Sequence, residues 1–318
     1  MVRVIEKRAS TILFNTLKGN QYHFDGGYIV IPANVCPIVP ATFLKAGVKF
    51  KFLDIDLNTQ CLDISLIYKE LKSPFCKGIL FVHSYGNTQN TLGLFEEIKL
   101  LRDDLFLIDD RCVDIPITAD TMQNQFADLI LYSTGYAKFV EFGFGGFAFL
   151  SEKAGYKKLF GRFSEIQYRN LVTQLNQSIE NGKPFHYVDS DWLEFRNNFD
   201  EKAYFEKIET QIPISIAQKN KLNKIYSYQL PEEIQMPSSL CLWRFNLQVP
   251  NKKKLIKAIF DANLFASSHY ASISTLFGGD YAPKAEKAHS NMLNLFNDFR
   301  FSEDDALKVC DIICKNLK

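Results

Sequence analysis

Residues 128–150, DLILYSTGYAKFVEFGFGGFAFL, decide how this chain folds. They begin and end with short apolar runs, 128–133 and 145–150, and the loop between these runs carries Lys138 and a cluster of glycines. Short apolar runs bounded by turn residues are typical of strands that are buried on both faces. Loops held by such strands often carry functional side chains, so this loop is the first place to look for chemistry.

The same pattern recurs through the first half of the chain. Four more apolar runs precede this stretch and are interpreted as strands: YIVIPA (28–33), VKFKFLDI (48–55), GILFVH (78–83) and LFLIDD (105–110). Between them, apolar residues have helical spacing in 37–47, 64–72 and 94–104. Alternating strands and helices predict an α/β fold with a mostly parallel central sheet covered by helices. Ligands of such sheets bind beyond the carboxyl ends of the strands.

Beyond this stretch the pattern changes. Residues 151–211 are polar with helical spacing, and a long helix is expected after Pro213. The run 241–249 alternates like a strand and is followed by an amphipathic helix. We therefore expect a large α/β domain over 1–211 and a smaller α+β domain over 212–318.

The composition argues against several classes of function. Among 318 residues, 37 Lys and Arg balance 36 Asp and Glu, so the positive excess of a nucleic-acid-binding protein is missing. No apolar run is long enough to span a bilayer, and the opening MVRVIEKRAS lacks the apolar region of a signal peptide. The seven scattered cysteines indicate reduced thiols and a cytoplasmic location. Cys310 and Cys314 have no matching second pair, so we expect no metal site.

Polar side chains follow two of the predicted strands where each strand ends. Asp109 and Asp110 close the run LFLIDD, Ser133 closes DLILYS, and Lys138 comes five residues after Ser133. Taken singly, an aspartate at a strand end is more often a turn residue, and a loop lysine is usually solvated. Only their common order and spacing point to a site.

A second group of polar residues lies near the start of the chain. Ser10 and Thr11 begin the helical stretch STILFNTLKG (10–19), where a pair of hydroxyl residues is normally an N-cap. The N–H groups and hydroxyls at such a helix start are also suited to binding a phosphate.

The order and spacing of these segments resemble the DegT/DnrJ/StrS sugar aminotransferases, within the fold-type I pyridoxal-phosphate enzymes. The resemblance extends over about residues 8–152, and as a set its motifs are fairly specific. It is carried by YIVIPANVCPIVPATFLKAGVKFKFLDIDLNTQCLD (28–63), GILFVHSYGN (78–87), LFLIDDRC (105–112) and YSTGYAKFVEFGFGG (132–146). The last segment matches the family's lysine loop, in which a serine stands five residues before the lysine and Gly143, Gly145 and Gly146 follow.

The resemblance implies a cofactor and roles for particular residues. Pyridoxal 5'-phosphate needs a lysine for a Schiff base and a carboxylate that keeps its ring nitrogen protonated. By resemblance Lys138 is the Schiff-base lysine and the general acid/base, and Asp110 is the carboxylate. The same resemblance places the remaining contacts of the cofactor: Ser10 and Thr11 in the phosphate-binding turn, Ser133 as a donor to the phosphate, and Cys36 against the ring.

The family also implies partners. Its members act as homodimers with active sites at the subunit interface, and they move an amino group from an amino acid such as glutamate to a sugar or nucleotide-sugar. The chain departs from the family at several positions. Cys36 replaces a stacking aromatic residue, Val113 replaces Gln or His, and Phe144 replaces a glutamate. The family's leading segment is missing, and RNNF (196–199) is a remnant of its Asn-x-Arg stretch.

Three interpretations stay open at the level of sequence. The chain is an active aminotransferase, a pyridoxal-phosphate enzyme of another reaction type such as a dehydratase, or a non-catalytic binding protein that kept the fold. The family's sugar dehydratases replace the lysine with histidine, so Lys138 argues against that reaction. We expect His83 to be a hydrogen-bonded structural residue, and His269 and Tyr270 to lie in a surface loop rather than at a substrate entrance. Trp192 and Trp243 are expected to be packing aromatics.

Overall fold

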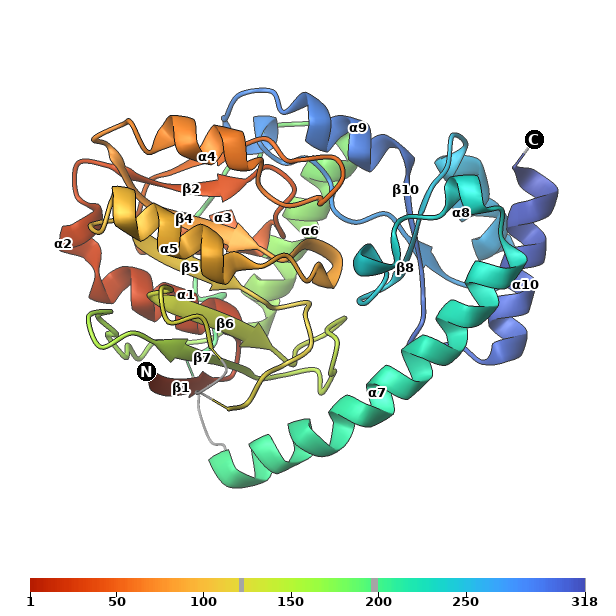
Figure 1. Ribbon diagram of the computed structural model, residues 1–318, viewed down its shortest axis with the longest axis horizontal. Coiled ribbons are helices and arrows are strands. Elements are labelled where there is room, and N and C mark those ends of the chain that lie inside the picture. Colours follow the sequence, from red (N-terminus) through yellow and green to blue (C-terminus); the bar gives the residue numbers. More distant parts are fainter. Residues whose placement is uncertain (120–122, 196–199, 318) are drawn as a thin grey trace.

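The computed structural model describes residues 1–119, 123–195 and 200–317, which form a seven-stranded central sheet and a second, three-stranded sheet (Figure 1). The central sheet has the order β1-β7-β6-β5-β4-β2-β3. Strands β3, β2, β4, β5 and β6 are parallel, whereas β7 and β1 are antiparallel to their neighbours. Its strands are β1 (Val2–Glu6), β2 (Tyr28–Pro32), β3 (Phe50–Leu53), β4 (Cys76–Val82), β5 (Phe106–Asp110), β6 (Leu129–Ser133) and β7 (Gly146–Leu150).

Helices cover both faces of the central sheet. One face packs against α1, α3 and α6, and the other against α4, α5 and the first turns of α7. The α-helices are α1 (Ala9–Gly19), α2 (Gln21–Phe24), α3 (Ile38–Ala46), α4 (Ile64–Glu70), α5 (Thr91–Leu101), α6 (Glu165–Asn181), α7 (Glu201–Gln229), α8 (Lys252–Asp261), α9 (Pro283–Asn291) and α10 (Glu303–Asn316). Short 3-10 turns are η1 (Ser84–Gly86), η3 (Glu232–Ile234), η4 (Ser238–Leu240) and η5 (Thr275–Phe277).

The six apolar runs of the first half are all strands, and most of them pair in parallel. The predicted α/β fold with a mostly parallel central sheet is therefore confirmed. Strand β1 was not expected, because it is an edge strand with two exposed residues, Val2 and Arg3, and lacks the continuous apolar character of the others. It pairs with β7 only.

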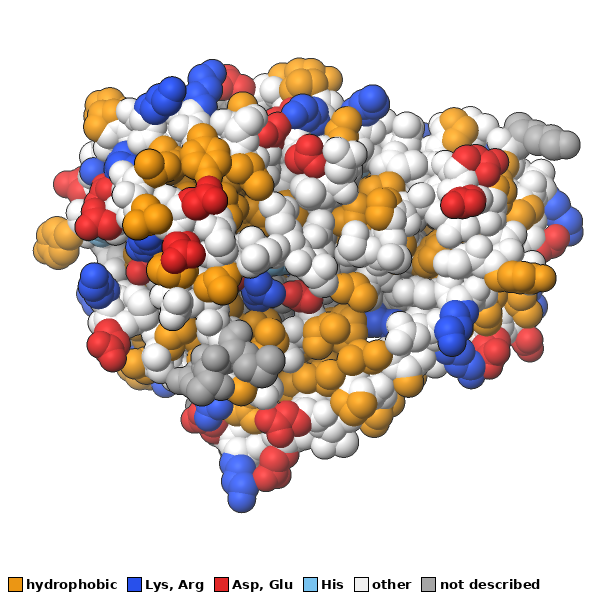
Figure 2. Space-filling view, viewed as in Figure 1, with side chains coloured by type: hydrophobic (Ala, Val, Ile, Leu, Met, Phe, Trp, Pro, Cys, Tyr) orange, Lys and Arg blue, Asp and Glu red, His pale blue; other side chains and the backbone are white. Residues whose placement is uncertain are grey.

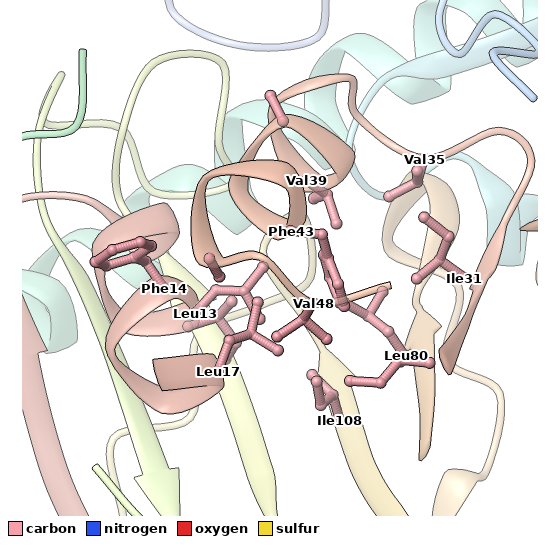
Figure 3. Close-up of a cluster of buried hydrophobic side chains, with 14 of the residues drawn as sticks. Leu13, Phe14, Leu17, Ile31, Val35, Val39, Phe43, Val48, Leu80 and Ile108 are labelled. Carbon is pink, nitrogen blue, oxygen red and sulfur yellow. The ribbon is translucent and has the colours of Figure 1, made fainter. Parts of the chain in front are cut away.

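The packing between helices and sheet is shown in Figure 3. Leu13 and Leu17, four residues apart on α1, face the same way and meet Phe43 of α3 over Leu80 and Ile108 of the sheet. All five side chains are at most 1% exposed. Burial of this kind contributes about 1.5–3 kcal/mol for each large apolar side chain, so this layer holds α1 firmly beside the carboxyl edge of the strands.

The second half does not separate cleanly from the first. Helix α7 starts at Glu201 and runs through Pro213, so the long helix that was expected to follow this proline begins earlier. Pro213 lies at an exposed position of the helix, so the backbone hydrogen bond that a proline cannot donate is lost at the surface rather than in the core. The predicted division after residue 211 falls inside α7, which leads from the central sheet to the small sheet (Figure 1).

The small sheet is antiparallel, with β10 between β8 and β9. Its strands are β8 (Phe245–Gln248), β9 (Ala266–Ser267) and β10 (Met292–Leu295). Helices α8 and α10 pack with it in one apolar cluster. Between β9 and β10 the chain returns to the large sheet, where Ile273 donates its N–H to Ala33 at 2.9 Å and α9 packs against Ile55. None of the helices in the described ranges has the length and apolar character needed to cross a membrane.

Candidate active site

The carboxyl ends of β5 and β6 bring Asp110 and Ser133 to one edge of the sheet. Asp110 lies opposite Val82 of β4 and Leu131 of β6, and Ser133 lies opposite Gly146 at the start of β7. Side chains alternate along a strand, so Asp110 shares a face with Ile108, and Ser133 shares that face with Leu131. Both polar side chains therefore continue the apolar face that α1 and α3 cover.

Asp110 is a buried carboxylate, 4% exposed, that receives a hydrogen bond from the Cys112 N–H at 3.0 Å. Burial raises the pKa of Asp110, while the bonds from Cys112 and the positive charge of Lys138 act in the opposite direction. Among the described residues, no cation lies within ion-pair distance of this carboxylate. A buried carboxylate without a cationic partner is costly, so this position favours a cationic ligand.

Lys138 is held by the backbone of the residue before it. Ala137 has a left-handed backbone, with φ of 55°, which is uncommon for a residue other than glycine. Its N–H donates to Glu141 at 3.0 Å, and its carbonyl accepts the Trp243 indole N–H at 2.7 Å. Strained backbone of this kind persists only where neighbours enforce it. Trp243 is thus more than the expected packing residue, because it links the small sheet to the lysine loop.

Asp109 points to the opposite face and is fully used there. It accepts hydrogen bonds from His83 Nε2 at 2.7 Å, Thr91 at 3.0 Å and Arg111 at 3.0 Å. Burial by itself raises its pKa, but the bonds from His83 and Arg111 outweigh burial, and the pKa is lowered. His83 also contacts the Asn87 carbonyl through Nδ1 at 2.7 Å, so both ring nitrogens are occupied. His83 is a hydrogen-bonded structural residue, as expected.

Ser10 and Thr11 differ sharply in what they offer to a ligand. Thr11 is completely buried, and its hydroxyl donates to the Glu194 carbonyl at 2.7 Å. Its hydroxyl hydrogen is therefore not available for a phosphate. Ser10 is partly exposed at the start of α1, where the N–H groups of Ala9 and Ser10 have no acceptor among the described residues. Free N–H groups at a helix start are ready to bind an anion.

Glycines allow the strands to approach α1 at this point. A Cβ atom on Gly146 would lie 2.5 Å from the Ala9 nitrogen, and one on Gly145 would lie 2.5 Å from Thr134 Oγ1. Gly145 also has φ of 94°, which L side chains rarely adopt. Ser133 lies beside them, accepting the Gly135 N–H at 3.2 Å. The glycines are thus required by close packing of the backbone around the loop that follows β6.

Two further residues near the start of α1 were missed by the sequence analysis. Arg8, the residue before the helix, lies with its guanidinium carbon 5.4 Å from the Tyr168 ring centre and 5.9 Å from that of Tyr136. It also faces Glu194 at 3.6 Å. Burial raises the pKa of Tyr168, and the charge of Arg8 opposes this shift. Arg8 lies two residues before Ser10 in the sequence, which was the available signal, whereas Tyr168 on α6 left none.

Cys36 and Tyr270 face the same region from opposite sides. Cys36 lies two residues before the start of α3 and remains partly exposed. Tyr270 stacks on Trp243, with ring centres 5.6 Å apart, and its N–H donates to Tyr85 at 3.0 Å. Burial raises the pKa of Tyr270, and the nearby Cys36 and Asp110 raise it further. A simple surface loop was expected at 269–270, and that expectation was wrong for Tyr270.

His269 has an exposed side chain, yet burial lowers its pKa to about 4, helped by the charges of Arg244 and Lys138. A side chain can be accessible to solvent and still have many protein atoms around it. The charge of Lys138 acts on both Asp110 and His269, and Cys36 and Asp110 both act on Tyr270, so these five residues lie near one another.

Comparison with known proteins agrees with this geometry. No protein-family model matches the chain. Among curated proteins, GDP-4-keto-6-deoxy-D-mannose 3-dehydratase from Escherichia coli O55:H7 is 33% identical over 95 residues, which are 29% of this chain and 23% of that protein. The matched part is thus less than a quarter of that relative.

Solved structures align over the whole chain. A DegT DnrJ EryC1 StrS aminotransferase from Brucella abortus has a TM-score of 0.71 at 16% identity, covering 100% of this chain and 86% of that one. The chain has the aminotransferase fold. The E. coli GDP-4-keto-6-deoxy-D-mannose-3-dehydratase with bound hydrated PLP has a TM-score of 0.66 at 18% identity, covering 100% and 88%.

Within the aminotransferase fold, the departures noted in the sequence have distinct locations. Val113 is buried in an apolar cluster with Tyr85 and Trp243, so it helps to hold these two aromatic side chains in place. Phe144 is partly buried and packs against Phe142 and Lys7. The segment 196–199, taken as a remnant of the Asn-x-Arg stretch, lies outside the described residues.

Proposed function

We propose that this chain is a pyridoxal-phosphate-dependent aminotransferase of the DegT/DnrJ/StrS sugar-aminotransferase family. It moves an amino group from an amino acid such as glutamate to a keto-sugar or related carbonyl compound. Lys138 and Asp110 are its catalytic residues. One observation supports this more than any other: Lys138 follows the carboxyl end of β6, and its charge acts on the buried carboxylate of Asp110, which has no ion-pair partner among the described residues.

The residues fit the cofactor at both ends. Asp110 is the buried anion that a protonated ring nitrogen needs, since it has no cationic partner among the described residues. Ser10, Ser133 and the free N–H groups at the start of α1 are suited to the phosphate, with Arg8 as a nearby positive charge. Thr11 supports this turn from within the core rather than through its hydroxyl.

When bound, pyridoxal phosphate supplies an aldehyde that exchanges amines and a protonated ring that withdraws electrons. Lys138 Nζ would hold that aldehyde, and its amine would accept and return the proton that transamination moves. The Asp110 carboxylate holds the ring nitrogen in its protonated form. Cys36 and Tyr270, which lie near each other and near Asp110, would border the ring in place of the family's stacking aromatic residue.

The substrate, the assembly and the location of the protein belong to the same proposal. The substrate is a sugar or nucleotide-sugar, in keeping with the resemblance and with the sugar nucleotide in the name of the curated relative. The chain acts as a homodimer in the cytoplasm. All seven cysteines are free thiols, which suits a reducing compartment. Nucleic acid and membranes are not partners in this proposal.

A dehydratase is the second candidate, because the curated sequence match is to a sugar dehydratase. Lys138 favours the aminotransferase, since the family's sugar dehydratases replace this lysine with histidine. The two candidates differ in what they do to the nitrogen of an amino acid. Only the aminotransferase transfers that nitrogen onward to the sugar.

The test is a half-reaction without a sugar acceptor. Purified protein loaded with pyridoxal phosphate is mixed with each of a panel of amino acids, including glutamate, and the oxo acid released is measured. The proposal expects stoichiometric oxo acid from at least one donor, together with loss of the visible absorption. Asp110→Asn should keep the absorption and slow the release by about a hundredfold or more, because electron withdrawal by the ring is weakened. Visible absorption without oxo acid from any donor would contradict an aminotransferase.

A further inference from the structure

A cavity of about 290 Å³ adjoins the loop that carries Lys138. Three parts of the chain enclose it: the loop at 138–141, the middle of α7 and the turn at 298–300. Figure 2 shows a small basic patch surrounded by apolar side chains on the face above α7. The volume of the cavity is near the lower end of the range for small-ligand pockets, about 300 Å³. None of the residues named in the proposed function except Lys138 lines it.

The charges around this cavity are out of balance. Besides Lys138, which also lines the cavity, three cations, Lys219, Arg244 and Arg300, face two carboxylates, Asp298 and Glu141. Both arginines bind Asp298, with Arg300 Nη1 at 2.6 Å, and Arg300 also binds Glu141. The arginines therefore use both carboxylates, and one positive charge is left without a counter-ion.

Lys219 carries that charge. It is 4% exposed, and its ammonium group donates to the Trp243 carbonyl at 2.9 Å and to Asn297 Oδ1 at 3.0 Å, both neutral acceptors. No carboxylate in the described part of the chain lies within ion-pair distance of it. Burial, together with the charges of Arg244 and Arg300, lowers the pKa of Lys219 to about 7, although Asp298 and Glu141 act in the opposite direction. A buried ammonium is normally paired.

Arg244 gives independent support for a missing anion. Its guanidinium is 3% exposed, and its Nε has no hydrogen-bond partner although it is buried. Arg244 also lies near His269, whose pKa it lowers together with Lys138. Lys138 and Arg244 thus both act on His269, and the cations form one group that reaches from Lys138 to the cavity.

We propose that this cavity, which Lys138 also lines, binds an oxyanion of the substrate through Lys219. As a part of the proposed aminotransferase site, it would hold a carboxylate of the amino donor or a phosphate of a nucleotide-sugar. The two sources share the same chemistry, a small oxyanion that supplies the missing counter-charge. The cavity itself does not require the cofactor.

The test uses the full chain with saturating pyridoxal phosphate and two probes that cannot react. Glutarate represents a donor carboxylate, and UDP represents a nucleotide phosphate. Binding is measured by calorimetry for the wild type, Lys219→Met, Lys219→Arg and the control Lys221→Met, whose lysine is exposed on the same helix and pairs with Glu303. We expect Lys219→Met to weaken binding by about tenfold or more, Lys219→Arg to restore part of it, and the control to bind like the wild type.

The probe that shows this dependence on Lys219 identifies the source of the anion. Absence of binding for both probes, or equal affinity in Lys219→Met, would overturn the proposal. A second measurement needs only the wild type. Near pH 8, an anion that pairs with Lys219 must draw a proton onto it, in the field of Arg244, Arg300, Asp298 and Glu141, so calorimetry in two buffers should show proton uptake. No uptake would also overturn it. Visible absorption in the same samples reports separately on the proposed function.

Discussion

Asp109 and Asp110 are neighbours in sequence and have opposite surroundings, because successive side chains of a strand point to opposite faces. Asp109 has three hydrogen-bond donors and a lowered pKa, whereas Asp110 has a raised pKa and no cation within ion-pair distance among the described residues. The sequence analysis selected Asp110 by resemblance. Strand alternation explains the choice physically, since only Asp110 shares the face that α1 covers.

Trp243 allows a test of how the lysine loop is positioned. Trp243→Phe keeps a buried aromatic ring but leaves the Ala137 carbonyl without its donor, at a cost of about 1 kcal/mol. We expect the affinity for pyridoxal phosphate to fall about fivefold, as measured by titrating the visible absorption. Trp192→Phe is the matched control, because Trp192 is equally buried and donates to Tyr187 at 3.1 Å, away from the loop. Equal affinities in the two variants would contradict the role given to Trp243.

Lys219 predicts how stability depends on pH. Its pKa is about 7 in the folded chain and 10.5 is its ordinary value, so the unfolded chain binds more protons between these limits. The free energy of unfolding should therefore rise with pH across this window, by at most about 1.4 kcal/mol per pH unit from this group. Urea unfolding of the ligand-free protein at about pH 7 and about pH 9 measures the rise. In Lys219→Met the rise should shrink, and an unchanged rise would show that other groups cause it.

At this scale, the sequence revealed residues whose positions are set by strand ends and missed those brought in by tertiary contacts. Lys138, Asp110 and Ser133 follow from local order. Trp243 and Tyr168 do not, since nothing in their own segments shows that they face the lysine loop or Arg8.

At the scale of elements, apolar continuity predicted the buried strands and failed for short or exposed ones. Strand β1, with its exposed first residues, and the two-residue β9 carry too little pattern to detect. Helix α9 was also missed, because its buried residues are small: Ala285 and Ala288. Alanines pack α9 closely against Ile55, which no hydrophobic periodicity would reveal.

Asp54 makes α9 a testable element. Its carboxylate accepts the N–H groups of Lys284 and Ala285, each at 2.9 Å, and so caps the first turn of α9 from the central sheet. Asp54→Ala should lower the free energy of unfolding by about 1–2 kcal/mol, by analogy with N-cap removal. Affinity for pyridoxal phosphate should stay within about twofold, since α9 does not contact the cofactor residues. Asp103→Ala, at an exposed position, is the control, and an equal loss of stability there would contradict the capping role.

At the scale of the whole molecule, the fold class followed from the sequence while the division into domains is less clean than 1–211 and 212–318 implies. Residues 271–291 follow the small sheet's β9 and yet pack on the large sheet, for example through Ile273 and Leu276. Such a return of the chain depends on long-range contacts, and no linker composition marks it.

The proposed homodimer makes a prediction of its own. Phe160 and Ile166 are 82% and 72% exposed, near the partly exposed Tyr168 of the cofactor region. Exposed apolar side chains that gather into one patch mark surfaces that bind a partner, and we expect these two side chains to belong to the dimer interface. Light scattering should give twice the mass of one chain, and Phe160→Glu with Ile166→Glu should reduce it to one, because burying unpaired charges is costly. A wild-type monomer at micromolar concentration would contradict the dimer.

The central claim is that Lys138 holds pyridoxal phosphate against Asp110, and visible absorption tests it most directly. Wild type and Lys138→Ala, each shown to be folded by circular dichroism, are titrated with the cofactor and the absorption of the bound form is measured. The account predicts a saturable visible band in the wild type that is absent from Lys138→Ala. A folded wild type without a band, or an unchanged band in Lys138→Ala, would contradict it.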